Sequence, residues 1–349
     1  MRAVTFQGPQ DVRVEDRPEP ELAAATDAIV RVEATGVCGS DLHIYSGRIP
    51  IEPGFTIGHE YVGTVIAVGD AVSQISEGDR VLGTYLTACG HCYFCRRREY
   101  HQCDSSCVFG HGATLGSLQG TQAEQALVPN ADLTLRQIPD GLSDELALFA
   151  GDVAGTGYDA IFGDAARLDL LEPGSTVAVL GLGPVGLMAV QFARASGAAL
   201  VVAVDSVADR LEMARSFGAV PVHLTEENPR SRVKELTAGR GVDLAVDAVG
   251  HADALDLAVR LARKAGTVSV IGVFSERTDI HMGIVWIKAL RIRAGQANVI
   301  GHLDRVLAML SAGIVDPSPL VSMTMSLEEA PDAYRIYANR EALKIVLRP

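Results

Sequence analysis

Five of the six cysteines in this chain of 349 residues lie close together, between positions 89 and 107. Four of them follow the spacing Cys-x2-Cys-x2-Cys-x7-Cys, at Cys89, Cys92, Cys95 and Cys103. Such spacing lets one short loop surround a tetrahedral zinc ion, and a closed shell of four thiolates is typical of a structural site. The alternative, unrelated buried thiols, would require a chance cluster. We therefore predict a structural zinc lobe at residues 89–103, with no ligand role for Cys107.

A second set of metal-binding residue types comes earlier in the chain, in the motifs Cys38-Gly-Ser-Asp-Leu-His43 and Gly58-His59-Glu60. A thiolate from Cys38 and an imidazole from His59 supply two of the three protein ligands of a catalytic zinc, whose fourth position stays open. Taken singly, a buried cysteine is usually inert and a lone histidine is usually an ordinary core residue. The two motifs together indicate a second metal site, one that can do chemistry.

A glycine-rich turn, Gly-Leu-Gly-Pro-Val-Gly at residues 181–186, follows one apolar strand and opens a helix that runs to about residue 196. Gly181 permits the tight turn, Gly183 lets the backbone approach a pyrophosphate, and Gly186 lets the helix pack against the strand. The helix N-terminus favours phosphate because its free N–H groups and its dipole attract anions. The turn indicates a dinucleotide site, although such turns also occur for structural reasons alone.

Asp205 ends the next apolar strand, 19 residues after Gly186. A carboxylate at this place accepts both ribose hydroxyls of an adenosine and repels a 2'-phosphate, so NAD is favoured over NADP. Arg210 is close enough in sequence to temper that preference. In the alternative interpretation, Asp205 only caps the helix that begins near Ala208.

The elements that must position these residues change in character along the chain. Residues 1 to about 150 hold short β-rich runs such as 29–32 and 63–69, bounded by Gly, Pro or Asp, which predicts a compact barrel-like β domain. From about 170 onward, continuously apolar strands alternate with helical segments, which predicts a parallel sheet covered by helices; the strands are 177–180, 200–204, 244–246 and 268–271. The last segment, from about 293, holds a predicted helix at 302–312 and a final strand at 344–347.

Composition excludes several classes of protein. Hydrophobic residues make up 48% and charged residues 21% of the chain, a balance that suits a soluble globular protein. The net charge of -13 repels polyphosphate, so nucleic acid is not expected as a partner, and the run Arg96–Arg98 is interpreted as a solvated patch. The N-terminus lacks a signal-peptide core, and glycines and a proline interrupt the longest apolar stretch, 177–195. We expect a cytoplasmic protein without membrane association, whose cysteines bind metal rather than form disulfides.

The order of these motifs closely resembles the zinc-containing medium-chain alcohol dehydrogenase family over nearly the whole chain. A Cys-x-Ser-x2-His motif, a Gly-His-Glu motif, a four-cysteine lobe and a Rossmann turn follow one another, as in that family. The resemblance implies two domains. A GroES-like β-barrel catalytic domain is expected at residues 1–150 and 293–349, and a Rossmann NAD-binding domain at residues 151–292.

The resemblance also implies roles for residues around the catalytic metal. Cys38 and His59 look like zinc ligands, and Asp152 occupies the position of the third ligand, where many family members carry cysteine. A carboxylate is still a competent zinc ligand. Glu60 is the competing candidate, either as a direct ligand or in exchange with water, and Asp152 is favoured.

Ser40 resembles the family's first proton-relay hydroxyl, and His43 resembles the exit base that is connected through the cofactor ribose. The alternatives are a turn hydroxyl for Ser40 and a surface histidine for His43. Gly39 takes a position that is basic in some members, and Tyr85 is expected near the substrate pocket. Four further positions are expected to line the cofactor, although the valines could also be core residues: Thr156, Val185, Val249 and Val273.

The sequence therefore predicts an NAD-dependent zinc alcohol dehydrogenase with one catalytic and one structural zinc ion per chain. It leaves the substrate open among simple alcohols, polyols and amino alcohols. One alternative is a zinc-free quinone or enoyl-type reductase of the same fold, and another is an NAD-binding protein without catalytic activity. Family resemblance also implies a homo-oligomer, with a tetramer favoured over a dimer.

Overall fold

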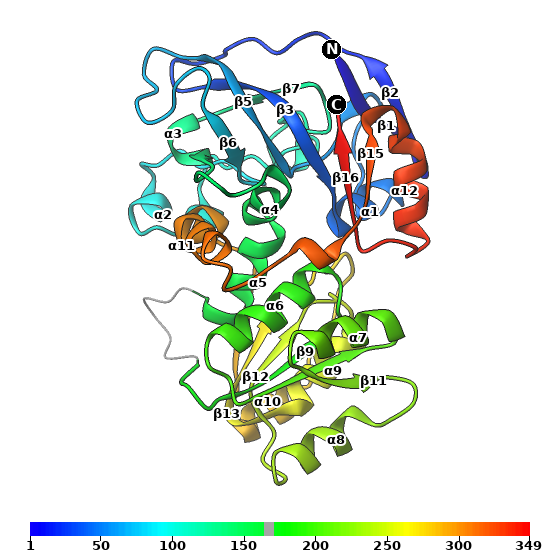
Figure 1. Ribbon diagram of the computed structural model, residues 1–349. Helices are drawn as coiled ribbons and strands as arrows, with labels where there is room; N and C mark the ends of the chain where they lie inside the picture. Colours follow the sequence, from blue (N-terminus) through cyan, green and yellow to red (C-terminus); the bar gives the residue numbers. More distant parts are fainter. Residues whose placement is uncertain (164–170) are drawn as a thin grey trace. The chain divides into compact units, whose positions relative to one another are not determined.

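The structure is a computed structural model that describes residues 1–163 and 171–349 (Figure 1). It divides into two compact units. The first, here called the β unit, comprises Met1–Gly155 and Asn298–Pro349, and the second, the α/β unit, comprises Thr156–Ala297. None of the helices in the described ranges is long and apolar enough to cross a bilayer.

The α/β unit is built on six parallel strands in the order β11-β10-β9-β12-β13-β14. Their bounds are β9 Thr176–Leu180, β10 Leu200–Asp205, β11 Val220–His223, β12 Val242–Asp247, β13 Ala262–Val270 and β14 Arg291–Ala294. The central strand β9 is buried along its whole length, as its continuously apolar sequence predicts. The strands expected between residues 177 and 271 are confirmed.

Helices cover both faces of this sheet. They are α6 Pro184–Ala195, α7 Ala208–Ser216, α8 Pro229–Leu236, α9 Ala252–Leu261 and α10 Met282–Lys288. Figure 1 shows α6 and α7 on the viewer's side of the sheet. Val233, Val259 and Val285, from α8, α9 and α10, are buried in one cluster with strand residues such as Val202 and Val268. In this strand order the chain builds outward from β9 in one direction and then, from β12, in the other. Parallel sheets bind ligands at such a switch point, at the carboxyl ends of the strands, which here is between β9 and β12.

The β unit contains a seven-stranded sheet with the order β15-β16-β3-β5-β6-β8, in which β7 also pairs with β3, and a small sheet ordered β2-β1-β4. The strands are β1 Arg2–Gly8, β2 Asp11–Asp16, β3 Ala28–Val37, β4 Phe55–Thr56, β5 Tyr61–Val68, β6 Arg80–Gly83, β7 Gln125–Val128, β8 Leu135–Gln137, β15 Val321–Ser326 and β16 Lys344–Arg348. Strand β16 pairs antiparallel with β3, with Ile345 opposite Val37. The C-terminal tail thus completes this unit, as the family resemblance implies.

Short helices connect these strands: α1 Gly39–Tyr45, α2 Tyr93–Arg96, α3 Ala131–Thr134, α4 Asp144–Leu148, α5 Val153–Phe162, α11 Val299–Ser311 and α12 Ala330–Ala338. Helix α5 begins in the β unit and continues into the α/β unit. Helix α11 starts three residues before the predicted helix at 302–312, so the predicted start is wrong. The apolar face already begins at Val299 and Ile300, which are 0% and 4% exposed, and burial therefore extends the helix by almost a turn.

Candidate functional site

Four side chains that can bind a metal meet inside the β unit: those of Cys38, His59, Glu60 and Asp152. Each offers one ligand atom, these atoms all lie within 4.8 Å of one another, and all four residues are buried. Cys38 caps the N-terminus of α1, His59 and Glu60 precede β5, and Asp152 precedes α5. The fold therefore brings together positions that lie more than a hundred residues apart in the sequence.

Asp152 faces both the thiol and the imidazole of this cluster. Its Oδ2 atom lies 3.4 Å from Cys38 Sγ and 3.3 Å from His59 Nε2. Ser40 Oγ lies 3.1 Å from the same Nε2 atom. Sulfur, nitrogen and carboxylate oxygen are the ligand atoms that zinc takes in proteins, so this arrangement supports Asp152 as the third donor.

Asp41 holds the imidazole from the other side, a role that we did not predict from the sequence. Its Oδ1 atom lies 3.1 Å from His59 Nδ1, and its Oδ2 atom accepts a 2.9 Å hydrogen bond from the backbone N–H of Cys38. A carboxylate on one imidazole nitrogen directs the other nitrogen toward a metal and makes it a better ligand. The capping spacing, an acidic residue three positions after the N-cap, is the signal that could have revealed Asp41.

Glu60 is paired with a buried lysine. Lys344, on β16, forms an ion pair with Glu60, both side chains are 0% exposed, and Nζ of Lys344 also donates to the Val37 carbonyl at 3.2 Å. A Cβ at Gly36 would overlap the Glu60 carboxylate, so glycine makes room for the pair. Because Glu60 already has a cationic partner, the structure supports Asp152 over Glu60 as the ligand. Lys344 is a charged residue in the otherwise apolar strand predicted at residues 344–347, and this is the sequence signal that could have revealed a buried ion pair.

The charges in this cluster interact strongly. Burial lowers the pKa of the His59 imidazole, but the carboxylates of Asp41 and Asp152 outweigh burial and raise that pKa well above its usual value. Burial raises the pKa of Asp152, but hydrogen bonding and charge from His59 outweigh it and hold that pKa at about 2. Burial and the carboxylates of Asp152 and Glu60 raise the pKa of the Cys38 thiol to about 11.

These residues fit a zinc ion. The Cys38 thiol and two carboxylates, those of Asp152 and of the Lys344-paired Glu60, lie in a buried space around one imidazole. Like charges in such a space destabilise one another, and a divalent cation would reverse that effect and favour the thiolate form of Cys38.

His43 lies on α1, one turn beyond Ser40. Burial, together with the nearby cation of Arg48, lowers the pKa of His43. Its Nδ1 atom is buried and has no hydrogen-bond partner among residues 1–163 and 171–349. The structure thus places Ser40 against the metal cluster and His43 on the same helix, and the proton-relay roles stay predictions.

The four-cysteine lobe forms a second cluster, with ligand atoms from Cys89, Cys92, Cys95 and Cys103 within 4.8 Å of one another. Backbone N–H groups point at the sulfurs, as in the bonds from Cys89 N to Cys103 Sγ (3.2 Å) and from Cys95 N to Cys92 Sγ (3.5 Å). Backbone hydrogen bonds from Cys95 and Asp104 lower the pKa of Cys92 to about 6. Burial, by contrast, raises the pKa of Cys95 and of Cys103. Four clustered sulfurs, of which those of Cys92 and Cys103 accept backbone N–H bonds, fit a tetrahedral zinc ion.

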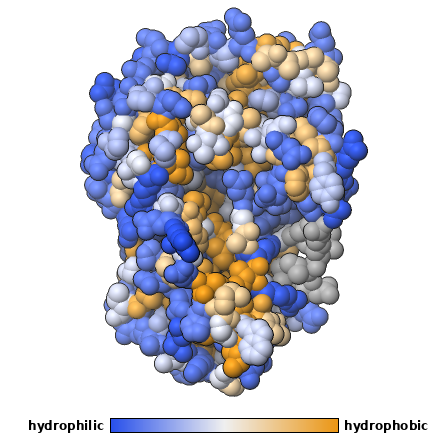
Figure 2. Space-filling model, turned by 180° about the vertical axis from the view of Figure 1, so that it is seen from behind, coloured by the Kyte–Doolittle hydropathy of each residue, from blue (hydrophilic) through white to orange (hydrophobic). Residues whose placement is uncertain are grey.

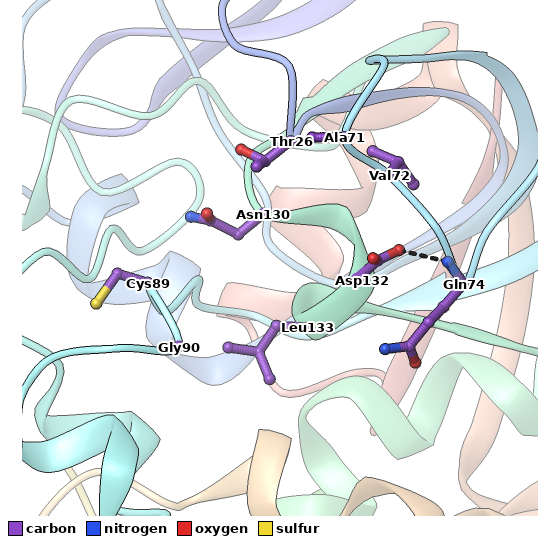
Figure 3. A pocket seen from close by; sticks show the side chains of 9 residues that line it. All are labelled: Thr26, Ala71, Val72, Gln74, Cys89, Gly90, Asn130, Asp132 and Leu133. Carbon is purple, nitrogen blue, oxygen red and sulfur yellow. Dashed lines mark hydrogen bonds between the residues drawn. The ribbon is translucent and has the colours of Figure 1, made fainter.

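A pocket of about 220 Å³ lies beside this lobe (Figure 3). Its lining residues are Thr26, Ala71, Val72, Gln74, Cys89, Gly90, Asn130, Asp132 and Leu133. The carboxylate of Asp132 accepts hydrogen bonds from the backbone N–H groups of Ser73 and Gln74, and Figure 3 shows the second of these. Because its charged side chain is already satisfied, we assign this pocket no role in catalysis.

The glycine turn has the geometry that its sequence predicts. Gly181 has a φ of +85°, a conformation that glycine adopts without strain, and Gly183 is the N-cap of α6 with open space around its Cα. A Cβ at Gly186 would overlap the carbonyl oxygen of Gly181. The N-terminus of α6 is therefore free to receive an anion, as a dinucleotide site requires.

Asp205 lies at the end of β10 and holds the backbone around it. Its Oδ2 atom accepts a 2.6 Å bond from the N–H of Leu182, and Oδ1 accepts bonds of 2.7 and 3.0 Å from the N–H groups of Ser206 and Val207. The carboxylate thus links the glycine turn to the start of α7. Arg210 is half-buried on α7. A role toward the ribose stays a prediction for both residues.

The remaining predicted cofactor positions have different environments. Val249 and Val273, after the ends of β12 and β13, are 49% and 47% exposed, so the alternative that they are core residues is wrong. Both residues follow the last residue of their strand, so the sheet and its covering helices do not bury them. Thr156, on α5, and Val185, on α6, are half-buried.

Comparisons with known proteins agree with this description. A zinc-binding dehydrogenase family model matches residues 184–310, and an alcohol dehydrogenase GroES-like domain model matches residues 24–140. The uncharacterized zinc-type alcohol dehydrogenase-like protein AdhB of Bacillus subtilis (strain 168) is 36% identical over 384 residues, covering 100% of both chains.

Solved structures match as well. The alcohol dehydrogenase TADH from Thermus sp. ATN1 is 43% identical with a TM-score of 0.95, covering 100% of this chain and 99% of that one. Two matches at 28% identity, each covering 100% of this chain and 99% of the other, contain cofactors. The short chain alcohol dehydrogenase (rspB) from E. coli CFT073 was solved with NADH (TM-score 0.87), and a protein of Sinorhizobium meliloti 1021 with NADP (TM-score 0.85).

The fold thus combines a Rossmann dinucleotide-binding domain with a GroES-like domain, an architecture of oxidoreductases. The chain belongs to the zinc-containing medium-chain alcohol dehydrogenase family.

Proposed function

We propose that this protein is an NAD-dependent zinc alcohol dehydrogenase, which transfers a hydride between a small alcohol and NAD and gives an aldehyde or ketone. The meeting of Cys38, His59 and Asp152 in one buried cluster carries this proposal. We assign catalysis to residues 1–150 and 293–349 and NAD binding to residues 151–292. The compact units divide close to these boundaries.

Each residue of the cluster has a role in this reaction. A zinc ion held by Cys38, His59 and Asp152 would supply Lewis acidity at the oxygen of the substrate. Ser40, whose hydroxyl lies against His59, takes the proton of the reacting hydroxyl, and His43 carries it toward solvent. Hydride from the carbinol carbon goes to the nicotinamide ring.

The neighbouring residues keep this arrangement in place. Asp41 fixes the orientation of the His59 ring, because it contacts Nδ1 of the imidazole. Lys344 holds the Glu60 carboxylate.

We also propose a structural zinc ion at the four-cysteine lobe. With both sites filled, each chain of this protein would contain about two zinc ions, one at the open catalytic site and one at the closed structural site. The test is metal analysis of the purified protein combined with NAD reduction by a panel of alcohols. Alcohol-dependent NADH formation with about two zinc ions per chain is expected.

The same experiment separates the two alternatives. Zinc-independent reduction of quinones or enoyl compounds would favour a zinc-free reductase. That interpretation assigns no function to either metal-binding cluster. Tight NAD binding without any turnover would favour a non-catalytic NAD-binding protein, and either result contradicts the proposed dehydrogenase.

NAD is the proposed cofactor because Asp205 places a carboxylate at the end of β10, where a 2'-phosphate would be repelled. Replacing Asp205 by asparagine removes the charge but keeps an acceptor oxygen for the backbone. We expect the ratio of kcat/KM for NADP to that for NAD to rise roughly tenfold or more. Steady-state kinetics with both cofactors measures it. Asp253→Asn, an exposed change on α9, serves as the control, and an unchanged ratio in Asp205→Asn would argue against the assignment.

We propose a homo-oligomer, with a tetramer favoured because of the family resemblance, and an exposed apolar surface of the α/β unit supports association between copies. Trp286 and Ile287 on α10 are 82% and 71% exposed, and β14 is an edge of the sheet among the strands described. Figure 2 shows apolar side chains exposed on the surface as orange atoms. Exposed apolar side chains and an unpaired strand edge each favour association with a second copy.

Replacing Trp286 by glutamate is expected to shift the protein toward a smaller assembly in analytical ultracentrifugation, because it would bury a charge in the interface. Ile314→Glu, at a 56% exposed position of the β unit, is the matched control. The interface is elsewhere if both variants keep the assembly of the unaltered protein. We further propose a cytoplasmic location, since none of the six cysteines is in a disulfide and a reducing compartment keeps thiols available for metal.

A further inference from the structure

His111 is a buried histidine beside the candidate metal cluster that the reaction described above leaves without a role. It is 6% exposed, and its ring lies edge-on to that of His59, with 5.4 Å between ring centroids and 63° between ring planes. Rings at this separation are in contact. A molecule bound at His59 is therefore within reach of His111.

The backbone around His111 explains this position. Its two neighbours, Gly110 and Gly112, have φ values of +70° and +66°, in the left-handed region that favours glycine. A Cβ at Gly110 would lie 2.7 Å from the backbone N and O atoms of Gly58, the residue before His59. The loop thus packs directly against the Gly-His-Glu motif, and the two glycines permit that approach.

The two nitrogens of the His111 ring have different surroundings. Nδ1 lies 2.8 Å from the carbonyl oxygen of Phe109. Because a carbonyl only accepts, Nδ1 donates and carries a proton. Nε2 forms no hydrogen bond with any other residue of the described ranges. It differs from Nδ1 of His43, which is fully buried, because it is not among the fully buried atoms that have no partner. The free nitrogen of a fixed ring is therefore open to a ligand.

We propose that Nε2 of His111 hydrogen-bonds a second hydroxyl of the substrate, on the carbon next to the reacting carbinol, so that vicinal diols and short polyols are preferred over plain alkanols. This inference rests on the proposed dehydrogenase activity and names its substrate class. A hydroxyl both donates and accepts, so it satisfies either form of the ring. An alkyl group in the same place would displace water from Nε2 and leave it without a partner, which weakens binding.

The test compares 2-butanol with 2,3-butanediol, which differ by one hydroxyl, as substrates of the full-length zinc-loaded protein with NAD. We expect kcat/KM for the diol to be higher by about tenfold, the value of one hydrogen bond to a buried acceptor. In His111→Phe, the ratio of kcat/KM for the diol to that for 2-butanol should fall by about that factor, because the diol loses its hydrogen bond and 2-butanol no longer leaves a nitrogen unpaired. His111→Gln, whose side-chain amide reaches the place of Nε2, should keep much of the preference.

Imidazole ¹⁵N spectra give a readout that does not depend on turnover. Adding 2,3-butanediol to the complex with NADH should shift the Nε2 resonance assigned to His111, whereas 2-butanol should shift it much less. Thermal melting of both variants reports whether the loop still folds.

The possible failures are distinguishable. Equal kcat/KM for the two alcohols in the unaltered protein overturns the inference and leaves the dehydrogenase proposal standing. If His111→Phe lowers both substrates equally, or lowers the melting temperature together with both activities, His111 only supports the loop and the inference is wrong. Absence of turnover with either alcohol contradicts the dehydrogenase proposal itself, and the inference with it.

Discussion

Replacing Cys38 by alanine is expected to lower kcat/KM for alcohol oxidation on the order of a thousandfold or more and to remove one zinc ion per chain. Cys38 supplies the sulfur of a cluster whose other donors, His59 and Asp152, cannot close a three-ligand site alone. The side chain is buried, at 8% exposed, but alanine removes only one sulfur atom, so the loss of packing should be small. Kinetics with NAD, metal analysis and a melting curve on the same sample measure all three effects.

Cys107→Ala is the matched control for this variant. Cys107 is a half-exposed thiol that belongs to neither metal-binding cluster, and its Sγ atom lies 3.5 Å from the Gly116 carbonyl. Zinc content and activity should stay as in the unaltered protein. Full activity in Cys38→Ala, or loss of zinc from Cys107→Ala, would show that the metal ligands are assigned wrongly.

Replacing Lys344 by methionine is expected to lower the free energy of unfolding by about 3–5 kcal/mol, because it leaves the Glu60 carboxylate buried without its cation. Both side chains of the pair are 0% exposed, so solvent does not screen the interaction. Methionine has nearly the length of lysine and fills the same space. Urea unfolding of the zinc-loaded protein measures the loss.

Two further variants separate the effect of the ion pair from that of the lysine chain. The double variant Glu60→Gln with Lys344→Met removes both charges and should regain part of the lost stability. Lys264→Met, at an exposed lysine of the α/β unit, should change stability by less than about 0.5 kcal/mol. A loss in Lys344→Met no larger than in Lys264→Met would show that the pair contributes little.

The elements of the fold could be predicted where the pattern of a few neighbouring residues decides them. Strand β9 is continuously apolar from Val177 to Leu180, as suits a strand buried on both faces, and the turn at Gly181 needs the φ that glycine permits. The start of α11 lies earlier than predicted, although Asn298, a residue type that often caps helices, stands directly before Val299. The burial of Val299 and Ile300, which makes them part of the helix core, depends on tertiary packing.

The candidate site was predictable in part for the same reason. Cys38 and His59 lie in short motifs, whereas Asp152 was named only through resemblance to a family. Lys344 reaches Glu60 because β16 pairs with β3 in one register, with Ile345 opposite Val37. Such a register between distant strands leaves no trace in local spacing. His111 had no signal at all in the sequence.

The pairing of β16 with β3 has a consequence for synthesis of the protein. The β unit draws its strands from both ends of the chain, while residues 156–297 form a contiguous unit. A nascent polypeptide can therefore complete the α/β unit while it is still attached to the ribosome. Lys344 follows the whole α/β unit in the chain, so the buried carboxylate of Glu60 gains its counter-ion only after that unit has been synthesised.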